Sequence, residues 1–350
     1  MCEVFVKLVL SLLLLWYHSA SGHARDYDHG LDLPTTQPLN IAHRGSSGVY
    51  PEHTAEGYQL AVDQSADMIE TDLVVTRDLE LVCLHESWLS PSTNVADVYP
   101  EDRMNTYFVF DQARNVTDYF SVDFTLDELR ALAHRQRFGQ RDPNYDDQLG
   151  LVTLSELIDI VQAANGTVGM FVELKDPQWV NSLDILQESG TTFEQLVIDV
   201  LESRGYSSQS DPCCVMSFNT QSLLDLSTLT SLPLMKATSA PVTDALLAFY
   251  ATFLYGIVPN KELIVVTNAR NQITAITDLG NRTHSYGLRM FPFTARNEYN
   301  YLAYDYQQDP YLEYQTLLDE GGADGIITDF PATFGRYLES VGGANCTIKL

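Results

Sequence analysis

Positive charge is scarce in this sequence. Its 350 residues include 20 lysines and arginines against 47 aspartates and glutamates, which gives a formal net charge of −27 at pH 7. Such an acidic surface repels nucleic acids and anionic membranes, so we expect neither as a partner. An acidic protein that takes an anionic substrate needs local positive charge to admit it, so the lysines and arginines near a candidate site are informative.

Cysteine is also scarce, with five in the chain and no C-x-x-C pair. Zinc sites commonly draw on closely spaced cysteines, so this spacing argues against zinc. The hydrophobic content of 45% is ample for a sizeable core, and 350 residues suit one large barrel or two domains.

Long apolar runs are missing beyond the first residues of the chain. Lys7 precedes a short apolar run over Leu8–Trp16, and small residues follow up to Ala24. This order indicates a cleaved signal peptide over residues 1–24 and a mature chain over 25–350, with an uncleaved signal anchor as the alternative. The run is too short to span a bilayer comfortably, and no other stretch is apolar enough, so we expect no stable membrane insertion.

Four N-x-Thr triplets fit a secreted glycoprotein. Glycans attach to such triplets where they lie at the surface, so each asparagine is predicted to be exposed. The four are Asn115, Asn165, Asn281 and Asn345.

Polar side chains gather at the ends of short apolar runs between residues 39 and 86. Leu39–His43 reads as a strand that ends at Gly45, Asp67–Val75 reads as the next strand, and Leu79–Leu84 reads as a third that delivers His85. Unpaired charge is costly to bury, and a metal ion with an anionic substrate would supply partners. Clustered titratable groups therefore favour a functional site over a solvated strand edge.

Three carboxylates fit a site for a hard cation. Side chains alternate along a strand, so Glu70 and Asp72 share one face of theirs. In a later strand over 168–174, Glu173 shares a face with Lys175 in the same way. Carboxylate oxygens suit Ca²⁺ or Mg²⁺, and oxygen ligands alone do not distinguish the two ions.

The order of these motifs resembles the glycerophosphodiester phosphodiesterase family, from about residue 39 to about residue 335. Its longer secreted members, of the periplasmic and plant type, are the most similar. One departure is the acid after the second histidine, which is aspartate in many members and Glu86 here. The motifs are His43-Arg44-Gly45, Pro51-Glu52-His53-Thr54, Glu70-Thr71-Asp72, His85-Glu86, the stretch Phe171–Lys175 and the stretch Asp324–Pro331.

The resemblance implies an activity and its residues. The expected reaction is metal-dependent hydrolysis of a small glycerophosphodiester to sn-glycerol 3-phosphate and an alcohol. The resemblance implies that His43 and His85 are the acid/base pair, and that Glu70, Asp72 and Glu173 hold one divalent cation. We favour Ca²⁺ because the expected compartment is extracellular, with Mg²⁺ as the alternative.

Further residues are expected to contact the substrate. Arg44 would donate in a fork to phosphate oxygens, Lys175 would add a point charge, and Phe218, at a strand end, would line the pocket. Glu52 has open roles: it would bind the metal, or it would orient Arg44 or a substrate hydroxyl. His53 stands where asparagine is common in the family and is expected to be structural.

Strands alternate with helices along the rest of the chain, which is typical of a parallel sheet. We predict an α/β fold, a (β/α)8 TIM barrel, with sites at the C-terminal ends of its strands. An insertion after the third strand, over about 87–150, would form a lid on that face or a plain long loop. Further strands are expected over 214–218, 232–237, 263–267, 286–290 and 324–328, and helices over 55–65, 125–132, 153–164, 192–204, 220–229, 241–254, 270–279, 311–320 and 332–340.

The cysteines that remain after a leader is removed are placed by this fold. Cys83 would face the barrel interior, like His85, as a buried thiol. Cys213 and Cys214 would open a strand at the N-terminal face, and Cys346 would return to that face after the last helix. Adjacent cysteines pair only under strain, so we predict one disulfide from Cys346 to Cys213 or Cys214.

Two other functions fit parts of the sequence. Phospholipase D-like cleavage of lysophospholipid or sphingolipid head groups would require a surface that docks on membranes, against which the acidic charge argues. A non-catalytic secreted surface protein could keep the barrel, but it would be expected to lose a histidine or a metal carboxylate, and all are present.

Overall fold

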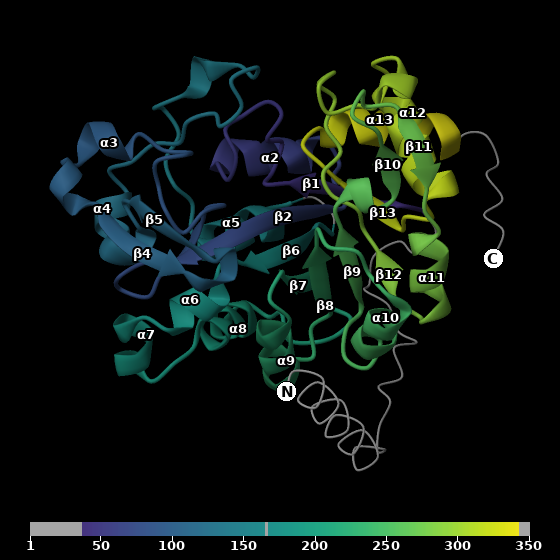
Figure 1. Cartoon of the computed structure of the whole chain (residues 1–350). Helices are drawn as coiled ribbons and strands as arrows, with labels where there is room; N and C mark the ends of the chain where they lie inside the picture. The colour runs from purple at the N-terminus through teal and green to yellow at the C-terminus, as the bar shows by residue number, and fades with distance from the viewer. Residues whose placement is uncertain (1–36, 165–166, 343–350) are drawn as a thin grey trace, which may run out of the picture.

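A closed ring of parallel strands forms the centre of the protein (Figure 1). The computed structural model describes residues 37–164 and 167–342. Within them the parallel strands lie side by side in the order β12, β9, β8, β7, β6, β2, β1, β13. They are β1 (Leu39–His43), β2 (Met68–Val75), β6 (Gly169–Leu174), β7 (Cys213–Ser217), β8 (Leu234–Thr238), β9 (Gly256–Pro259), β12 (Arg289–Met290) and β13 (Gly325–Thr328).

Backbone hydrogen bonds close the ring between its first and last members. The Asp324 N–H donates to Met290 O at 2.8 Å, and the Ile327 N–H donates to Pro292 O at 3.0 Å. The Ala295 N–H in turn donates to Ile327 O at 3.0 Å. The predicted (β/α)8 barrel is therefore confirmed.

Helices cover the outside of the barrel, and polar caps begin several of them. Thr153 begins α5 with a capping box, in which its hydroxyl and the Glu156 side chain each bond the other residue's backbone N–H. The helices are α2 (Ala55–Asp63), α5 (Leu154–Ala163), α6 (Pro177–Asn181), α7 (Asp184–Ser189), α8 (Phe193–Ser203), α9 (Thr220–Leu229), α10 (Asp244–Tyr250), α11 (Leu279–Ser285), α12 (Pro310–Gln315), η7 (Thr316–Glu320) and α13 (Pro331–Gly342).

Alternation along each strand divides the core into two layers. In β2, Met68 belongs to a small apolar cluster with residues of the other barrel strands, such as Ile41 and Phe171. Its neighbour Ile69 belongs to the larger cluster that the strands share with the helices. Every second residue of a strand therefore points into the barrel, and this includes Glu70 and Asp72.

The predicted third barrel strand is not part of the ring. β3 (Leu81–Cys83) runs antiparallel to the end of β2, with Cys83 opposite Leu73. β2 is long enough to pair with β6 inside the barrel and with β3 beyond it. The insertion therefore follows the second barrel strand, and Cys83 is buried in the outer layer rather than in the barrel interior.

The insertion is a folded lobe, drawn in blue on the left of Figure 1, and it shares an apolar core with the ends of β2 and β3. That core includes Leu89, Phe124 and Leu129. Thr125 and Glu128 form the predicted capping box at the start of its helix α4. Its elements are α3 (Val95–Val98), η1 (Glu101–Arg103), β4 (Asn105–Val109), η2 (Phe110–Gln112), β5 (Arg114–Asp118), η3 (Ser121–Asp123), α4 (Leu126–Leu129) and η4 (Pro143–Tyr145).

The segment from 256 to 279 differs from its prediction. The sixth barrel strand is β9, which is only four residues long and ends in a proline that cannot donate to the ladder. The predicted strand over 263–267 is instead β10 (Val265–Thr267), which forms a hairpin with β11 (Ile273–Ile276), where a helix was expected. Two 3₁₀ turns, η5 (Lys261–Leu263) and η6 (Tyr304–Tyr306), complete the described elements.

The structure describes only some of the residues on which the cysteine and signal-peptide predictions depend. Cys213 and Cys214 are fully buried at the start of β7, whereas Cys346 and the expected signal peptide lie outside the described residues. Asn115 and Asn281 are exposed as predicted, and the other two asparagines also lie outside the described part. Among the described residues, no helix is long and apolar enough to cross a membrane.

Candidate active site

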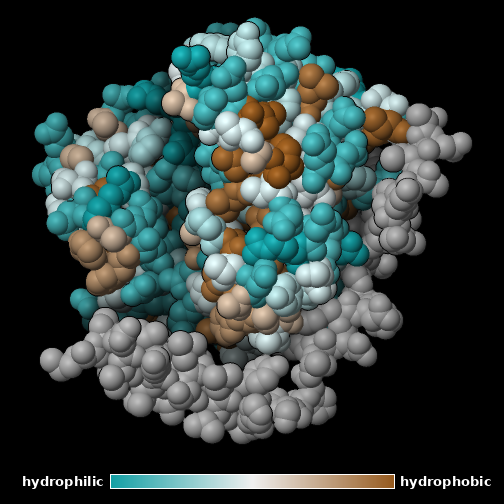
Figure 2. Space-filling view, turned by 45° about the vertical axis from the view of Figure 1, so that its right-hand side comes forward, coloured by the Kyte–Doolittle hydropathy of each residue, from teal (hydrophilic) through white to brown (hydrophobic). Residues whose placement is uncertain are grey.

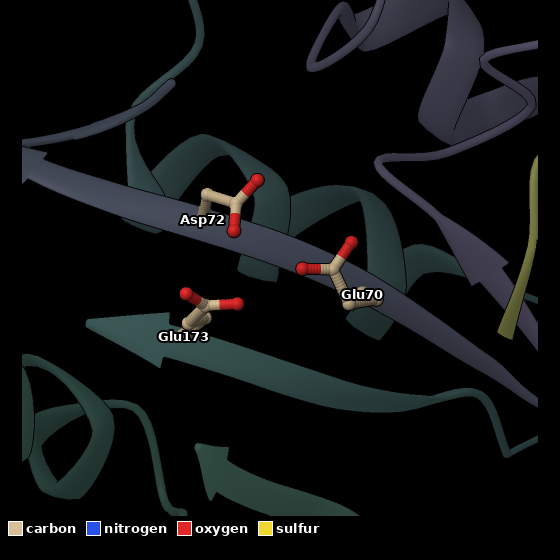
Figure 3. Close-up of side chains that lie close together, drawn as sticks. All are labelled: Glu70, Asp72 and Glu173. Carbon is tan, nitrogen blue, oxygen red and sulfur yellow. The ribbon is translucent and has the colours of Figure 1, made fainter. Parts of the chain in front are cut away.

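Three carboxylates meet at the C-terminal end of the barrel interior (Figure 3). Glu70 and Asp72 come from β2, and Glu173 comes from the neighbouring strand β6, where it lies opposite Asp72 in the parallel register. One oxygen of each residue lies within 4.8 Å of one oxygen of each of the others. The period-2 spacing that the sequence showed is what brings them together.

The three carboxylates are buried but differ in their share of positive charge. Burial raises the pKa of Asp72, but Lys175 and Arg44 outweigh this and hold it well below its ordinary value. Burial and the nearby Asp72 raise the pKa of Glu70 well above its ordinary value. Burial raises the pKa of Glu173 to about 7 although Lys175 opposes the change. Lys175 Nζ lies 2.8 Å from Glu173 Oε1 and 3.4 Å from Asp72 Oδ1, so the cation predicted to touch substrate also neutralises this group.

His43 ends β1 and is held by a carboxylate from the far end of the chain. Its Nδ1 lies 2.5 Å from Asp329 Oδ1, and its Nε2 lies 4.0 Å from Glu70 Oε2. Burial raises the pKa of Asp329, but His43, Arg296 and Arg141 outweigh this and hold it well below its ordinary value. Asp329 is therefore ionised and can only accept, so the proton on His43 is on Nδ1 and the lone pair of Nε2 faces the cavity.

His85 follows β3 and lies beside its own neighbour in the chain. Its Nδ1 is 2.7 Å from Glu86 Oε1, and the same oxygen accepts a hydrogen bond from Arg137 Nη2 at 2.6 Å. Burial lowers the pKa of His85 well below its ordinary value, and Arg44 and Lys175 lower it further. Arg137 belongs to the insertion, so that lobe reaches the site.

Arg44 ties the first motif to the carboxylates. Its Nη1 donates to Glu52 Oε2 at 2.7 Å, and its Nε lies 3.1 Å from Asp72 Oδ2. Glu52 therefore orients Arg44, which is one of the three roles left open for it. Burial raises the pKa of Glu52, but Arg44 and Arg137 outweigh this and lower it to about 2. His53 is fully buried and bonds Asp72 Oδ2 at 3.1 Å, which supports its predicted structural role.

A cavity of about 310 Å³ is lined by six of the residues of the site: His43, Arg44, Glu70, His85, Glu173 and Lys175. Phe218 lines it as predicted, with 43% of the residue exposed. Its ring packs edge-on against that of Phe293, with the centroids 5.8 Å apart. On the visible face of the molecule a hollow with largely hydrophilic walls runs between its left and right parts (Figure 2).

The residues fit a divalent cation. The three carboxylates of the cluster and two beside it, Glu52 and Glu86, make five. Three cations form ion pairs with four of these five, all except Glu70; the cations are Arg44, Lys175 and Arg137. Burial, and after it the charge of Asp72, raises the pKa of Glu70 and of Glu173, although Arg44 opposes the change in both and Lys175 opposes it in Glu173. Buried oxygen donors with uncompensated negative charge are the donor set that Ca²⁺ and Mg²⁺ prefer.

Sequence reasoning missed several residues that complete the site. Asp329 lies in a stretch that the motif comparison had included, but nothing local connected it to His43. Arg137 and Arg141 lie in a polar insertion without periodicity, and Arg296 lies in a loop. The sequence pointed to these three arginines in one way: lysine and arginine are rare in this chain, so each one near an anionic site is a candidate functional residue.

Comparisons with known proteins agree with this geometry. A family model described as the glycerophosphoryl diester phosphodiesterase family matches residues 43–333. A glycerophosphodiester phosphodiesterase of Arabidopsis thaliana is 37% identical over 330 residues, covering 88% of this chain and 87% of that protein. A glycerophosphodiester phosphodiesterase of Haemophilus influenzae is 25% identical over 382 residues, covering 95% and 98%.

A solved structure shares the fold. It is a phosphodiesterase of Oleispira antarctica in complex with the product sn-glycerol-3-phosphate, with a TM-score of 0.58. The two sequences are 22% identical, and the match covers 87% of this chain and 97% of that one.

Proposed function

Because this chain belongs to the glycerophosphoryl diester phosphodiesterase family, we propose that its barrel hydrolyses glycerophosphodiesters to sn-glycerol 3-phosphate and an alcohol. One observation carries the proposal. Two members of the three-carboxylate cluster, Glu70 and Glu173, line one cavity with two histidines, Arg44 and Lys175 at the C-terminal end of the barrel. Hydrolysis of a phosphodiester needs these groups, because its oxygens require charge neutralisation and its two proton transfers require a base and an acid.

The substrate phosphate is bound by the cations of the cavity. Arg44 and Lys175 both line it, and each has donors beyond those directed at its carboxylate partners. An arriving phosphate places negative charge beside them, and the attraction between these opposite charges is stronger in a buried site than in water. Phe218 offers an apolar edge to the carbon atoms of the glycerol or of the alcohol.

His43 and His85 move the protons. A glycerol hydroxyl next to the phosphate attacks phosphorus and gives its proton to His43 Nε2, the face that carries the lone pair. The bond from phosphorus to the leaving alcohol breaks, and that oxygen takes a proton from His85. His85 therefore carries this proton when the substrate is bound: burial, Arg44 and Lys175 lower its pKa before substrate binds, and the negative charge of the bound phosphodiester acts in the opposite direction. A cyclic phosphate remains. Water then opens it with the roles reversed, which returns both histidines to their starting states.

Glu70, Asp72 and Glu173 would hold one divalent cation, and we propose Ca²⁺ with Mg²⁺ as the alternative. When bound, such an ion neutralises charge on the phosphoryl oxygens. Lys175 then balances what remains on Glu173 and Asp72. We also propose that the protein is secreted and glycosylated, which the apolar N-terminal run and the exposed Asn115 and Asn281 support.

The test is hydrolysis of glycerophosphocholine with separate readouts of sn-glycerol 3-phosphate and choline. We expect both products in equal amounts, loss of turnover in excess chelator, and recovery when Ca²⁺ or Mg²⁺ is added back. Glu70→Gln should remove turnover and metal binding measured by calorimetry. Glu202→Gln, on an exposed part of α8, is the matched control and should leave both unchanged.

Two outcomes would contradict the proposal. Full turnover in excess chelator would remove the metal from the mechanism. Choline release from lysophosphatidylcholine without turnover of glycerophosphocholine would favour the phospholipase D-like alternative instead.

A further inference from the structure

Two arginines of the insertion donate hydrogen bonds to the two carboxylates that contact the histidines. They are four residues apart in the sequence. Arg137 donates to Glu86, which lies against His85, and Arg141 donates to Asp329, which holds His43. The two histidines come from different segments, His43 from the last position of β1 and His85 from the loop after β3. A single short segment, 137–141, therefore reaches both of them.

Arg141 is the more deeply buried of the two arginines. Its side chain is 3% exposed, and it bonds three separate loops of the barrel rim. Its Nη2 donates to Asp329 Oδ2 at 2.5 Å, its Nε to Glu298 Oε1 at 2.7 Å and its Nη1 to the Ser47 carbonyl at 2.9 Å. Asp329 uses its other oxygen for His43 Nδ1. Arg296 Nε donates to the same Asp329 Oδ2 as Arg141, at 2.7 Å, so Arg141 and Arg296 together fix the orientation of the carboxylate that holds the imidazole.

On the other side of the site, Arg137 donates to the carboxylate that lies against His85, whose Nδ1 makes no hydrogen bond with the described residues. Arg137 Nη2 donates to Glu86 Oε1 at 2.6 Å, and its Nη1 donates to Glu52 Oε1 at 3.2 Å. Glu86 Oε1 is the atom that lies 2.7 Å from His85 Nδ1. Without Arg137, this carboxylate would be free to turn away from the ring, because its second oxygen has no partner among the described residues.

We propose that Arg137 and Arg141 are positioning residues for the catalytic histidines, so that the insertion is part of the active site. The proposal rests on the proposed function for the roles of His43 and His85, but its geometry does not. Aromatic packing supports it: the Phe138 ring lies 4.4 Å from the Arg141 guanidinium and 4.9 Å from that of Arg296. The segment between the two arginines is thus held against the rim.

The proposal means that the structure of the insertion affects proton transfer by His43 and His85. Each guanidinium presents several donors in fixed directions, so it holds a carboxylate in one orientation where a lone charge would not. Outer partners of this kind are typically worth about ten- to a hundredfold in activity. The loss should fall on kcat, because neither arginine lines the cavity where substrate binds.

The experiment compares Arg141→Ala, Arg137→Ala and Arg141→Lys with the wild type by two methods. Kinetics on glycerophosphocholine give kcat and KM. Side-chain NMR of ¹⁵N-histidine-labelled enzyme gives the ring N–H signals of His43 and His85, assigned from His43→Ala and His85→Ala. Arg135→Ala is the matched control, because Arg135 pairs with Asp97 and Asp147 inside the insertion.

We expect Arg141→Ala to move the His43 signal and spare that of His85, and Arg137→Ala to do the reverse. Each should lower kcat about ten- to a hundredfold with little change in KM, and Arg141→Lys should recover part of the loss. Arg135→Ala should lower the melting temperature slightly and change neither signal. Asp329→Asn combined with Arg141→Ala should cost less than the product of the single losses, because both remove one linkage.

The proposal fails if Arg141→Ala and Arg137→Ala leave both histidine signals in place. It also fails if Arg135→Ala lowers kcat as much as they do, because the effect would then be loss of the fold. If the wild type turns over no glycerophosphodiester, the proposed function fails, and the NMR comparison still decides whether the arginines position the rings.

Discussion

His43 combines burial with a fixed tautomer. Burial lowers its pKa to about 4, with Arg44 acting in the same direction, and ionised Asp329 keeps the proton on Nδ1. A neutral ring whose lone pair faces a cavity is suited to take a proton. His85, with its lowered pKa, lines the same cavity.

The first prediction concerns this pair. His43→Ala and His85→Ala should each lower kcat on glycerophosphocholine by about a hundredfold or more, the usual loss when an acid or base is removed. His284→Ala, on an exposed part of α11, should keep kcat within a factor of about two. A His85→Ala enzyme with near wild-type kcat would move the acid role to another group of the cavity.

The structure shows why the first motif, His43-Arg44-Gly45, has a glycine at its third position. The φ of Gly45 is +81°, and a Cβ added there would lie 2.8 Å from the Gly57 backbone carbon and 2.9 Å from its oxygen. Both the left-handed backbone and the contact with α2 therefore exclude a side chain. The turn it allows places Arg44 against Glu70 and Asp72.

We predict that Gly45→Ala lowers the free energy of unfolding by about 1–3 kcal/mol or more, from backbone strain and overpacking together. Urea unfolding followed by circular dichroism measures it. Gly139→Ala is the control, since a Cβ there would meet nothing within 4 Å. Equal stability of the two variants would show that the β1–α2 loop adjusts easily.

At the scale of elements, local capping decides where several helices begin. The Thr153 hydroxyl accepts from the Glu156 N–H at 3.2 Å, and Glu156 Oε2 accepts from the Thr153 N–H at 2.8 Å. These bonds satisfy donors that the first turn of α5 would otherwise leave unpaired. Thr153→Ala should therefore cost about 1 kcal/mol of stability.

Urea unfolding tests this prediction as well. The control is Thr191→Ala, in the loop before α8, whose hydroxyl has no hydrogen-bond partner in the described part of the chain. We expect less than about 0.5 kcal/mol from it. A Thr153→Ala variant as stable as the control would mean that packing of α5 against α2 and β3, rather than its cap, decides the helix.

At the scale of the whole molecule, Asp324 holds the seam where the barrel closes. Its Oδ2 accepts from the Met290 N–H at 2.7 Å and bonds His284 Nε2 at 2.9 Å, and its Oδ1 accepts from Arg289 at 2.8 Å. Burial raises the pKa of Asp324, but these three partners outweigh it and hold the pKa below its ordinary value of 3.8.

The contribution of Asp324 to stability depends on pH. The pKa of Asp324 is lower in the folded protein than in the unfolded chain. Its ionised carboxylate therefore stabilises the fold at pH values above the unfolded pKa, and this stabilisation is lost as the pH falls through the folded pKa. Asp324→Asn should therefore cost about 1.5–3 kcal/mol at pH 7. The difference from wild type should shrink below about pH 4.

Urea midpoints between pH 7 and pH 3 measure this difference. Glu188→Gln, on the exposed surface of α7, serves as the control and should show no comparable cost at pH 7. An Asp324→Asn cost that stays constant down to pH 3 would mean that the shape of the side chain, rather than its charge, holds the seam.

The sequence by itself determined the features that depend on neighbours in the chain. Strand alternation placed Glu70 and Asp72 on one face, and the capping residues marked the start of α4 and α5. Alternating strands and helices gave the barrel, and the motifs gave the family. Each follows from local geometry, because the direction of a side chain in a strand depends only on its position.

Only the tertiary structure decided which distant residues meet. Asp329 contacts His43 across 286 positions of the chain, and Arg141 reaches Asp329 across 188. Strand direction was also undecided: an apolar run such as Leu81–Cys83 looks alike whether it pairs parallel or antiparallel, so β3 was assigned to the barrel in error. Partners of buried charges are chosen when the chain closes on itself, and no local pattern records that choice.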